Sequence, residues 1–562
     1  MNIAMPDRFD KNYCKRLNIV KFVSISTVAA LIIIFIGVRV AHGQEREGVI
    51  PFSDQLRRIK EIKKVTKIEV KVDASLKGEP YRHRMVQGIN FFQGVDYGSH
   101  RFLEEVGIGS FRYKYILNVF KDLNLEFDTK NPVGRFQKAM QEHTIKYMKL
   151  INEKGGKILV QIYGVPKWLS SNQDERMDTN ALPVYAKYPP KDYAKWQELV
   201  RRSLMKLKER GIKVDYCEIL GEPNYKSTWK GTPEELNRFY MKTAEAVKSI
   251  YPDCKVGGVA VGMIPNHRFP DEWVKGLLEY CKSNKVPFEF FTFHSYSPFL
   301  PMYLDYAMKY IRQRLSDFGY GNIEIHLTEW DIAGAHDIPL MKDTHFRASY
   351  IASSFIKMQR SGLDYQYLYS LYTPRETFFK RHTNKPFNGT FGIFTPELPD
   401  RKSMPKSAFN AFKVFGNLRG EVIPVEVKAS EYRASFKWVS MNFKDYNAMA
   451  VRNHEKISVI GAYYLPVKVY GYRKAGFEVP EPDFNVRSNA VFTVTNIPFK
   501  KWTYNIYFID KKHGNAYWGG NPELEIFESG KGQGQRFEKE IDVDIYSVVL
   551  IEIMNSEADQ KK

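Results

Sequence analysis

A chain of 562 residues is too long for one ordinary hydrophobic core, so two or more folded units are expected. With 43% hydrophobic and 26% charged residues, the composition is globular and excludes a largely disordered chain. The net charge of +20 favours acidic partners, but no basic stripe interleaved with aromatic residues indicates a nucleic-acid module.

The chain begins with a pattern typical of export. Residues Phe22–Val38 carry no charge, and five basic residues precede them: Arg8, Lys11, Lys15, Arg16 and Lys21. A positive flank keeps the N-terminus inside while the apolar run enters the membrane. Ala41-His42-Gly43 offers a cleavage site, but the run is longer than the core of a usual signal peptide. We interpret residues 1–43 as a cytoplasmic basic tail and signal or transmembrane segment, and prefer a retained single-pass anchor to a cleaved, secreted form.

Residues 44–79 are predicted to form a tether and a leading strand. From about residue 80, short β-type runs alternate with amphipathic helices such as Tyr193–Glu209 and Pro233–Ile250. The predicted strands are Met85–Phe91, Ser110–Tyr113, Lys157–Tyr163, Val214–Leu220, Lys255–Val259, Phe288–His294, Ile323–Thr328 and Tyr365–Tyr369. This alternation over residues 80–418 predicts an α/β fold, a (β/α)8 or TIM barrel.

The character of the sequence changes near residue 419. Short alternating runs separated by turns predict a C-terminal β-sandwich domain over residues 419–553, and the polar residues 554–562 are expected to be disordered. The four cysteines are too few for a disulfide framework and lack metal-ligand spacing. A pairing of Cys254 with Cys281 stays open.

Two glutamates at the ends of predicted barrel strands carry the functional prediction. The apolar run Tyr216–Leu220 stops at Gly221-Glu222-Pro223, because proline cannot donate a backbone hydrogen bond and glycine frees the backbone. The run Ile323–Thr328 leads into Glu329. TIM barrels place their chemistry at such strand ends, and a glycosidase needs two carboxylates. Glu222 is therefore the candidate acid/base and Glu329 the candidate nucleophile.

Other strand-end residues are candidates for binding the substrate. Arg112 on the second strand could hydrogen-bond Glu329 and keep it ionised. His294 and Tyr296 end the sixth strand and could orient Glu329 or contact sugar hydroxyls, although a strand-end histidine is as often structural. Trp168 after the third strand offers an aromatic platform, and Trp330 is a candidate wall on which a sugar can stack. Tyr369 and Tyr372 at the eighth strand are candidates for the pocket floor.

Glu218 shows that a buried carboxylate at a strand end need not be catalytic. It lies four residues before Glu222, and we interpret it as structural support inside the barrel. The sequence contains no dinucleotide glycine pattern, phosphate-binding loop or zinc motif, so no cofactor and no metal is expected.

These stretches resemble glycoside hydrolase family 39, a clan A retaining family that includes β-xylosidases, α-L-iduronidases and bacterial exopolysaccharide glycosidases. Glu218–Asn224 is similar to the family's acid/base motif and Thr328-Glu329-Trp330 to its nucleophile motif. Other similar stretches are Lys255–Gly258, Phe293–Tyr296, Asp343-Thr344, Phe391–Ile393, Met404–Phe409 and Ile509–Tyr517. The resemblance covers about residues 80–553 and implies the same roles for Glu222 and Glu329.

One position departs from the family's pattern. The family usually has asparagine before the acid/base glutamate, where it hydrogen-bonds the 2-hydroxyl of the sugar, and this chain has Gly221. Losing a contact that strengthens in the transition state can cost a few kcal/mol. Three explanations stay open: a different group at C2 of the sugar, another residue that supplies the contact, or a weakened enzyme.

The sequence therefore predicts a retaining glycoside hydrolase that acts outside the cytoplasm on a poly- or oligosaccharide, such as a bacterial exopolysaccharide. The basic charge suits an acidic polymer, and the N-terminal segment suits attachment to a membrane. The alternative is a non-catalytic polysaccharide-binding or assembly protein on a retired glycosidase fold. Gly221 favours this alternative, whereas the presence of both glutamates favours the enzyme.

Overall fold

The structure is a computed structural model that describes residues 58–91, 97–130, 132–176, 183–262, 271–333, 338–371, 385–396, 402–436, 439–467 and 482–557. Contacts divide the chain into residues 1–49 and residues 50–562, and every described residue belongs to the second unit. The apolar run Phe22–Val38 and Tyr372 thus lie outside the described residues. Within the described ranges, no helix has both the length and the apolar character to cross a bilayer.

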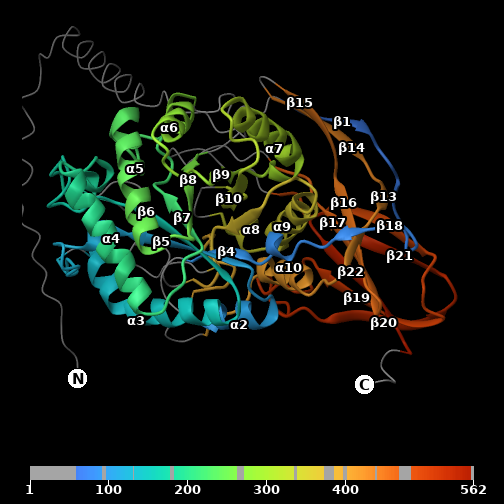
Figure 1. Cartoon of the computed structure of the whole chain (residues 1–562). Coiled ribbons are helices and arrows are strands. Elements are labelled where there is room, and N and C mark those ends of the chain that lie inside the picture. Colours follow the sequence, from blue (N-terminus) through green and yellow to red (C-terminus); the bar gives the residue numbers. More distant parts are fainter. Residues whose placement is uncertain are drawn as a thin grey trace, which may run out of the picture. The chain divides into compact units, whose positions relative to one another are not determined.

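Eight parallel strands close into a barrel in the order β10-β11-β4-β5-β6-β7-β8-β9 (Figure 1). Their bounds are β4 Gly88–Phe91, β5 Ser110–Ile116, β6 Lys157–Tyr163, β7 Tyr216–Ile219, β8 Lys255–Val261, β9 Phe290–Tyr296, β10 Glu324–Asp331 and β11 Tyr365–Leu368. Each overlaps one predicted strand, so the prediction of a TIM barrel is confirmed. The near-continuous burial of these strands explains why their apolar runs were readable in the sequence.

Helices surround the barrel strands, as Figure 1 shows. Their bounds are α2 Tyr97–Glu105, α3 Pro132–Glu153, α4 Tyr193–Glu209, α5 Pro233–Ile250, α6 Asp271–Ser283, α7 Leu300–Asp317, α8 Pro339–Lys342, α9 His345–Met358 and α10 Ser407–Gly416. Helices α4 and α5 begin and end at the predicted residues. In α5, Thr232 and Glu235 form a reciprocal capping box, and proline occupies the first turn.

Side chains fill the inside of the barrel. Near the N-terminal end, the rings of Tyr216, Phe290 and Tyr365 surround His326, with centroids 4.8–4.9 Å from the imidazole. Above this aromatic layer, buried Arg112 pairs with buried Glu218 at 2.5 Å. Glu218 thus lies inside the barrel, where the sequence analysis placed it.

Three sheets, antiparallel in all but one strand pair, make up the second part of the described chain. One has seven strands: β20 (Ile526–Gln533), β19 (Lys501–Ile509), β22 (Val548–Asn555), β17 (Lys456–Tyr463), β16 (Tyr446–Arg452), β12 (Glu421–Ile423) and β3 (Glu79–Pro80). Another has four: β13 (Val425–Lys428), β2 (Lys67–Asp73), β18 (Arg487–Thr495) and β21 (Arg536–Asp544). The third has three: β1 (Arg58–Lys63), β14 (Glu431–Ser435) and β15 (Ser440–Lys444).

The segment before the barrel belongs structurally to these sheets. Strand β2 lies between β13 and β18, and pairs antiparallel with the first and parallel with the second. Strands β1 and β3 extend the two other sheets. The segment 44–79 therefore supplies strands to all three sheets and not only the one leading strand that was predicted.

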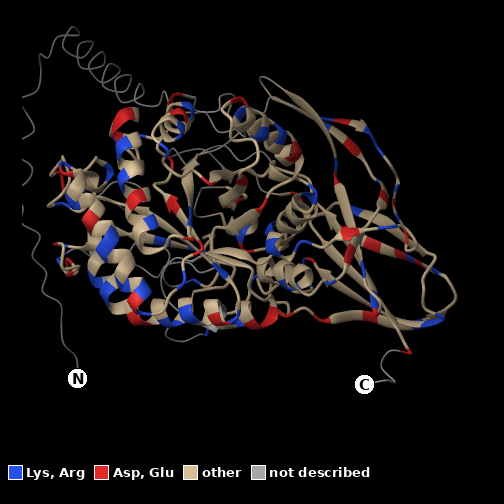
Figure 2. Ribbon diagram, in the orientation of Figure 1, with Lys and Arg blue, Asp and Glu red and all other residues tan. Residues whose placement is uncertain are grey.

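Aromatic packing joins the sheets to the barrel. The ring of Phe346 on α9 lies 4.5 Å from that of Tyr546, and the hydroxyl of Tyr464 donates to the carbonyl of Pro298 at 2.7 Å. Basic and acidic residues are interspersed along the helices and the sheets in Figure 2. Cys254 and Cys281 are both buried free thiols, so the disulfide left open by the sequence is not formed.

Candidate active site

Glu222 stands on a turn that is tied to the neighbouring strand. Leu220 and Glu222 both adopt left-handed backbone conformations, with φ of 63° and 53°, as the chain leaves β7. The Glu222 N–H donates to the carbonyl of Ala260 at 2.9 Å, and the Gly262 N–H donates to Asn224 Oδ1 at 3.1 Å. These bonds hold a non-glycine residue in a strained backbone region, as is common at functional sites.

Glu329 is aimed into the barrel by an irregularity in its strand. The pairing of β10 with β9 shifts between Leu327 and Glu329, after which Glu329 lies opposite His294. A bulge of this kind re-aims a side chain and is frequent next to active sites. Glu329 and His294 therefore meet at the mouth of the barrel.

Four groups surround the Glu329 carboxylate. Oε1 lies 2.9 Å from Arg112 Nη1 and 2.6 Å from Lys114 Nζ, and Oε2 accepts the Tyr296 hydroxyl at 2.7 Å. Burial alone would raise the pKa of Glu329, but the charges of His294, Lys114 and Arg112 outweigh it and hold this pKa well below its usual range. The nucleophile candidate is thus kept ionised.

Tyr296 keeps its proton in this site. Burial, and next the charge of Glu329, raise the pKa of Tyr296 well above its usual value. Its hydroxyl therefore remains a donor to the carboxylate.

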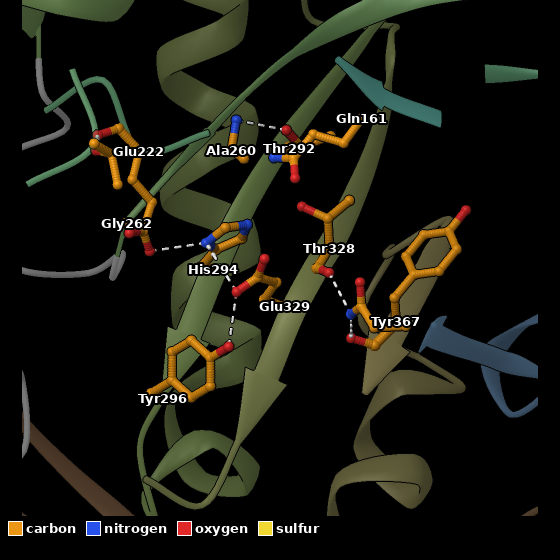
Figure 3. A network of polar contacts seen from close by, with 12 residues as sticks. Gln161, Glu222, Ala260, Gly262, Thr292, His294, Tyr296, Thr328, Glu329 and Tyr367 are labelled. Carbon is orange, nitrogen blue, oxygen red and sulfur yellow. Dashed lines mark hydrogen bonds and ion pairs between the residues drawn. The ribbon is translucent and has the colours of Figure 1, made fainter. Parts of the chain in front are cut away.

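His294 links the two candidate catalytic residues, as Figure 3 shows. Its Nδ1 lies 2.9 Å from Glu222 Oε1 and 3.8 Å from Glu329 Oε2. Because one nitrogen lies within 4 Å of both carboxylates, these two oxygens are less than ~7 Å apart. This bound includes the ~5–5.5 Å of a retaining pair and only the lower end of the ~6.5–9.5 Å of an inverting pair. The structure thus brings together Glu222, Glu329, His294 and Tyr296.

Arg112 holds Glu329 rather than a substrate. Its guanidinium is fully buried and donates to Glu218 Oε2 through Nε and Nη2, and to Asn90 Oδ1 through Nη1. The interpretation that Arg112 bonds Glu329 agrees with this geometry. A direct contact with substrate is excluded because no part of the side chain reaches solvent.

Aromatic side chains border the mouth. The ring of Tyr369 lies 4.9 Å from Phe391 and 6.2 Å from Tyr296, all edge-on. Trp168 is half-buried, and its indole N–H donates to the carbonyl of Phe120 at 3.1 Å, which leaves part of the ring available. Trp168 remains a candidate platform for a sugar, and Tyr369 remains a candidate for the pocket floor.

The interpretation of Trp330 as a sugar-stacking wall is wrong. Trp330 is fully buried, and its indole N–H donates to Gln366 Oε1 at 2.6 Å. Its ring packs on Tyr350 and Phe355 of α9. Neighbouring residues of a strand point to opposite faces, so with Glu329 turned inward Trp330 must face the helices.

Gly221, which follows β7, lies against a side-chain amide from the neighbouring strand β6. A Cβ atom at position 221 would be 2.6 Å from Gln161 Nε2. Gln161 is buried, and this amide nitrogen donates to the carbonyl of Leu220 at 3.1 Å. The glutamine of β6 thus occupies the space that a side chain at 221 would need.

Sequence reasoning missed Lys114, Asn90, Gln161 and Phe391. A signal existed for Lys114, because on β5 it stands two residues beyond Arg112 and therefore faces the same side of the sheet. No signal within one strand could place Gln161 next to Gly221, since that contact depends on the register of β6 with β7. Among the described residues, no group of three or more His, Cys, Asp or Glu could hold a metal ion.

Two carboxylates at the mouth of a (β/α)8 barrel, one on a turn after the fourth strand and one at the end of the seventh, are the arrangement that a barrel glycosidase requires. The profile of glycosyl hydrolases family 39 matches residues 147–462, more than half of the chain. The chain belongs to this family.

Individual relatives are more distant. A beta-xylosidase of Geobacillus stearothermophilus is 28% identical over 258 residues, which are 42% of this chain and 48% of that protein. A beta-xylosidase of Caldicellulosiruptor saccharolyticus is 28% identical over 260 residues, which are 42% of this chain and 49% of that protein. The chain thus spans about half the length of the curated relatives it matches.

Solved structures share the fold over most of the chain. A GH39 enzyme from Xanthomonas axonopodis pv. citri aligns with a TM-score of 0.63 at 16% identity, covering 88% of this chain and 98% of that one. A glucosidase from Croceicoccus marinus aligns with a TM-score of 0.60 at 20% identity, covering 87% of this chain and 99% of that one.

Proposed function

We propose that this protein is a retaining glycoside hydrolase in which Glu222 is the acid/base and Glu329 the nucleophile. The observation that carries the proposal is the state of Glu329. His294, Lys114 and Arg112 hold its carboxylate ionised at the C-terminal end of the barrel, and the same histidine bonds Glu222.

The chemistry runs in two steps. Glu222 gives its proton to the glycosidic oxygen while Glu329 attacks the anomeric carbon, so the leaving group departs and a glycosyl ester forms. Glu222, now ionised, then takes a proton from water, which attacks the same carbon and releases Glu329. His294 bonds Glu222 throughout and fixes the direction of its carboxyl group.

For the substrate we propose a poly- or oligosaccharide outside the cytoplasm, such as a bacterial exopolysaccharide. The support is the sequence: an apolar run after a basic flank, and a net charge of +20 that suits an acidic polymer. The two curated relatives are called beta-xylosidases, so xylan oligomers belong in the same test.

The test incubates the purified protein with a panel of acidic and neutral polysaccharides and measures new reducing ends. We expect cleavage of at least one polymer by the wild type and a loss of at least ~10⁴-fold in the Glu222→Gln, Glu329→Gln double variant. Glu324→Gln, at the other end of β10, is the matched control and keeps its activity. Binding of a polymer without cleavage by any of these proteins would instead support the non-catalytic alternative.

A further inference from the structure

Lys114 is a second cation on the candidate nucleophile, and the mechanism above uses it only to keep Glu329 ionised. It lies on β5 two residues beyond Arg112, so both side chains point into the barrel at successive levels. Its Nζ is 2.6 Å from Glu329 Oε1 and 4.8 Å from the centre of the Tyr369 ring. Its side chain is 17% exposed, so it borders the open mouth.

The two oxygens of Glu329 have different surroundings. Oε1 contacts the two basic side chains of β5, Arg112 and Lys114. Oε2 accepts the Tyr296 hydroxyl and lies 3.8 Å from His294 Nδ1, which also bonds Glu222. A carboxylate anchored through Oε1 presents Oε2 towards the acid/base residue. Oε2 is therefore the oxygen that forms the bond to the anomeric carbon.

The two cations differ in what they do after that bond forms. In the glycosyl ester Glu329 no longer carries its charge, and the attraction of both cations to Oε1 falls. The charge of Arg112 stays balanced by Glu218, at 2.5 Å. The attraction between Lys114 and Oε1 becomes stronger in every step that restores the charge of the carboxylate. The attack of water on the ester is such a step.

We infer that Lys114 is a positioning residue for the second step: it holds Glu329 Oε1 and stabilises the carboxylate that leaves when water cleaves the glycosyl-enzyme. In that step the bond from water oxygen to the anomeric carbon forms, the bond from that carbon to Oε2 breaks with its electron pair on Oε2, and Glu222 takes the water proton. This inference rests on the proposed function and deepens it.

Removing Lys114 should therefore make Glu329 a better nucleophile and a worse leaving group. In Lys114→Met we expect kcat to fall by about tenfold or more, while kcat/KM above the acid limb changes by less. The glycosyl ester accumulates, so an aryl glycoside of the sugar that the polysaccharide panel identifies gives a burst of released phenol close to one per enzyme. Lys114→Arg restores the wild-type ratio, because arginine returns the charge.

Lys255→Met is the matched control, because Lys255 pairs with Glu324 at 2.7 Å at the opposite end of the same strand that carries Glu329. It should give no burst. Equal losses of kcat and kcat/KM in Lys114→Met, without a burst, would overturn the inference and leave Lys114 a support for the fold.

A second measurement separates this inference from the proposed function. Glutamate labelled with ¹³C in its side-chain carboxyl group allows the titration of Glu329 by NMR, with its signal assigned by its loss in Glu329→Gln. We expect Lys114→Met to raise the pKa of Glu329 by ~1 unit or more, whether or not a substrate is known. An unchanged pKa refutes the role of Lys114, whereas a raised pKa in a protein that cleaves no glycan refutes the proposed hydrolase alone.

Discussion

Glu329 is a buried carboxylate whose charged neighbours determine its protonation state. Taken alone, a glutamate this deeply buried would become neutral, because the charged form is desolvated. Arg112, Lys114 and His294 reverse that effect and hold its pKa well below the usual range. An ionised carboxylate at ordinary pH is what the proposed role of Glu329 as the nucleophile requires.

The depressed pKa of Glu329 predicts the acid limb of the reaction. Protonation of the nucleophile should end activity only below about pH 4.3, the ordinary value for glutamate. A folded-state pKa below the unfolded one also stabilises the fold above the ordinary value, and this contribution is lost as the pH falls through the lower value. A profile of kcat/KM against pH checks the prediction, and an acid limb above pH 5 would contradict it.

Gly221 stands where the family usually has asparagine, and Gln161 occupies the space that a side chain at this position would need. Gly221→Ala places a methyl group where Gln161 Nε2 now lies, at 2.6 Å, and should push the amide off the carbonyl of Leu220. We expect a loss of about 1 kcal/mol of stability, seen as a lower melting temperature. In Gln161→Ala the second change Gly221→Ala should cost almost nothing more. Fully additive effects of the two changes would show that the side chains do not compete for this space.

At the residue scale, the sequence predicts the two glutamates but not their surroundings. Glu222 and Glu329 are visible because each ends an apolar run, whereas the groups that tune them come from other strands. Arg112 could be inferred from its polar character inside a buried strand. Asn90 and Gln161 depend on the register between strands, which no local pattern encodes.

At the element scale, the irregularity in β10 decides which side chains reach the site. The shift between Leu327 and Glu329 turns Glu329 inward, and Trp330 then packs among the helices. Adjacent residues of a strand point to opposite faces, so Glu329 and Trp330 do not both face the inside of the barrel. The wrong prediction that Trp330 stacks on sugar was therefore avoidable from the sequence. The irregularity itself has no clear sequence signal.

Trp330→Phe tests that assignment. The change leaves Gln366 Oε1 without its donor, and we expect a loss of about 1–3 kcal/mol of stability with KM unchanged. Thermal unfolding together with KM for the cleaved glycan measures both effects. A raised KM at an unchanged melting temperature would mean that the indole contacts sugar after all.

The barrel strands were predictable because burial on both faces produces continuous apolar runs. Strands β20 and β21 carry no such apolar runs. β20 is half-exposed or exposed along its whole length and β21 alternates buried with charged residues, so their segments IFESGKGQ and RFEKEIDVD look polar. The amphipathic helices α4 and α5 lie between these extremes and were placed correctly.

At the scale of the whole molecule, the strands before the barrel pair with strands that follow it in the chain. β2 is paired on both sides in its sheet, and β1 and β3 extend the two others. Pairing between segments some 350–420 residues apart cannot be read from a local pattern. This is why residues 44–79 were expected to be mainly a tether.

A truncated chain tests this pairing of the N-terminal strands. A protein that starts at residue 81 lacks β1, β2 and β3, exposes the edges of β13 and β18, and should aggregate or melt at a clearly lower temperature. A protein that starts at Ile50 keeps every described strand and is the matched control. Equal solubility and equal melting temperatures for the two would contradict the topology.

The central claim is that Glu222 and Glu329 act as a double-displacement pair. The most direct test follows the first product of cleavage by ¹H NMR, fast enough to see its anomeric configuration before mutarotation. Two displacements at one carbon predict a product with the configuration of the substrate bond. A product of the opposite configuration would mean a single displacement by water, and would contradict the role of Glu329 as the nucleophile.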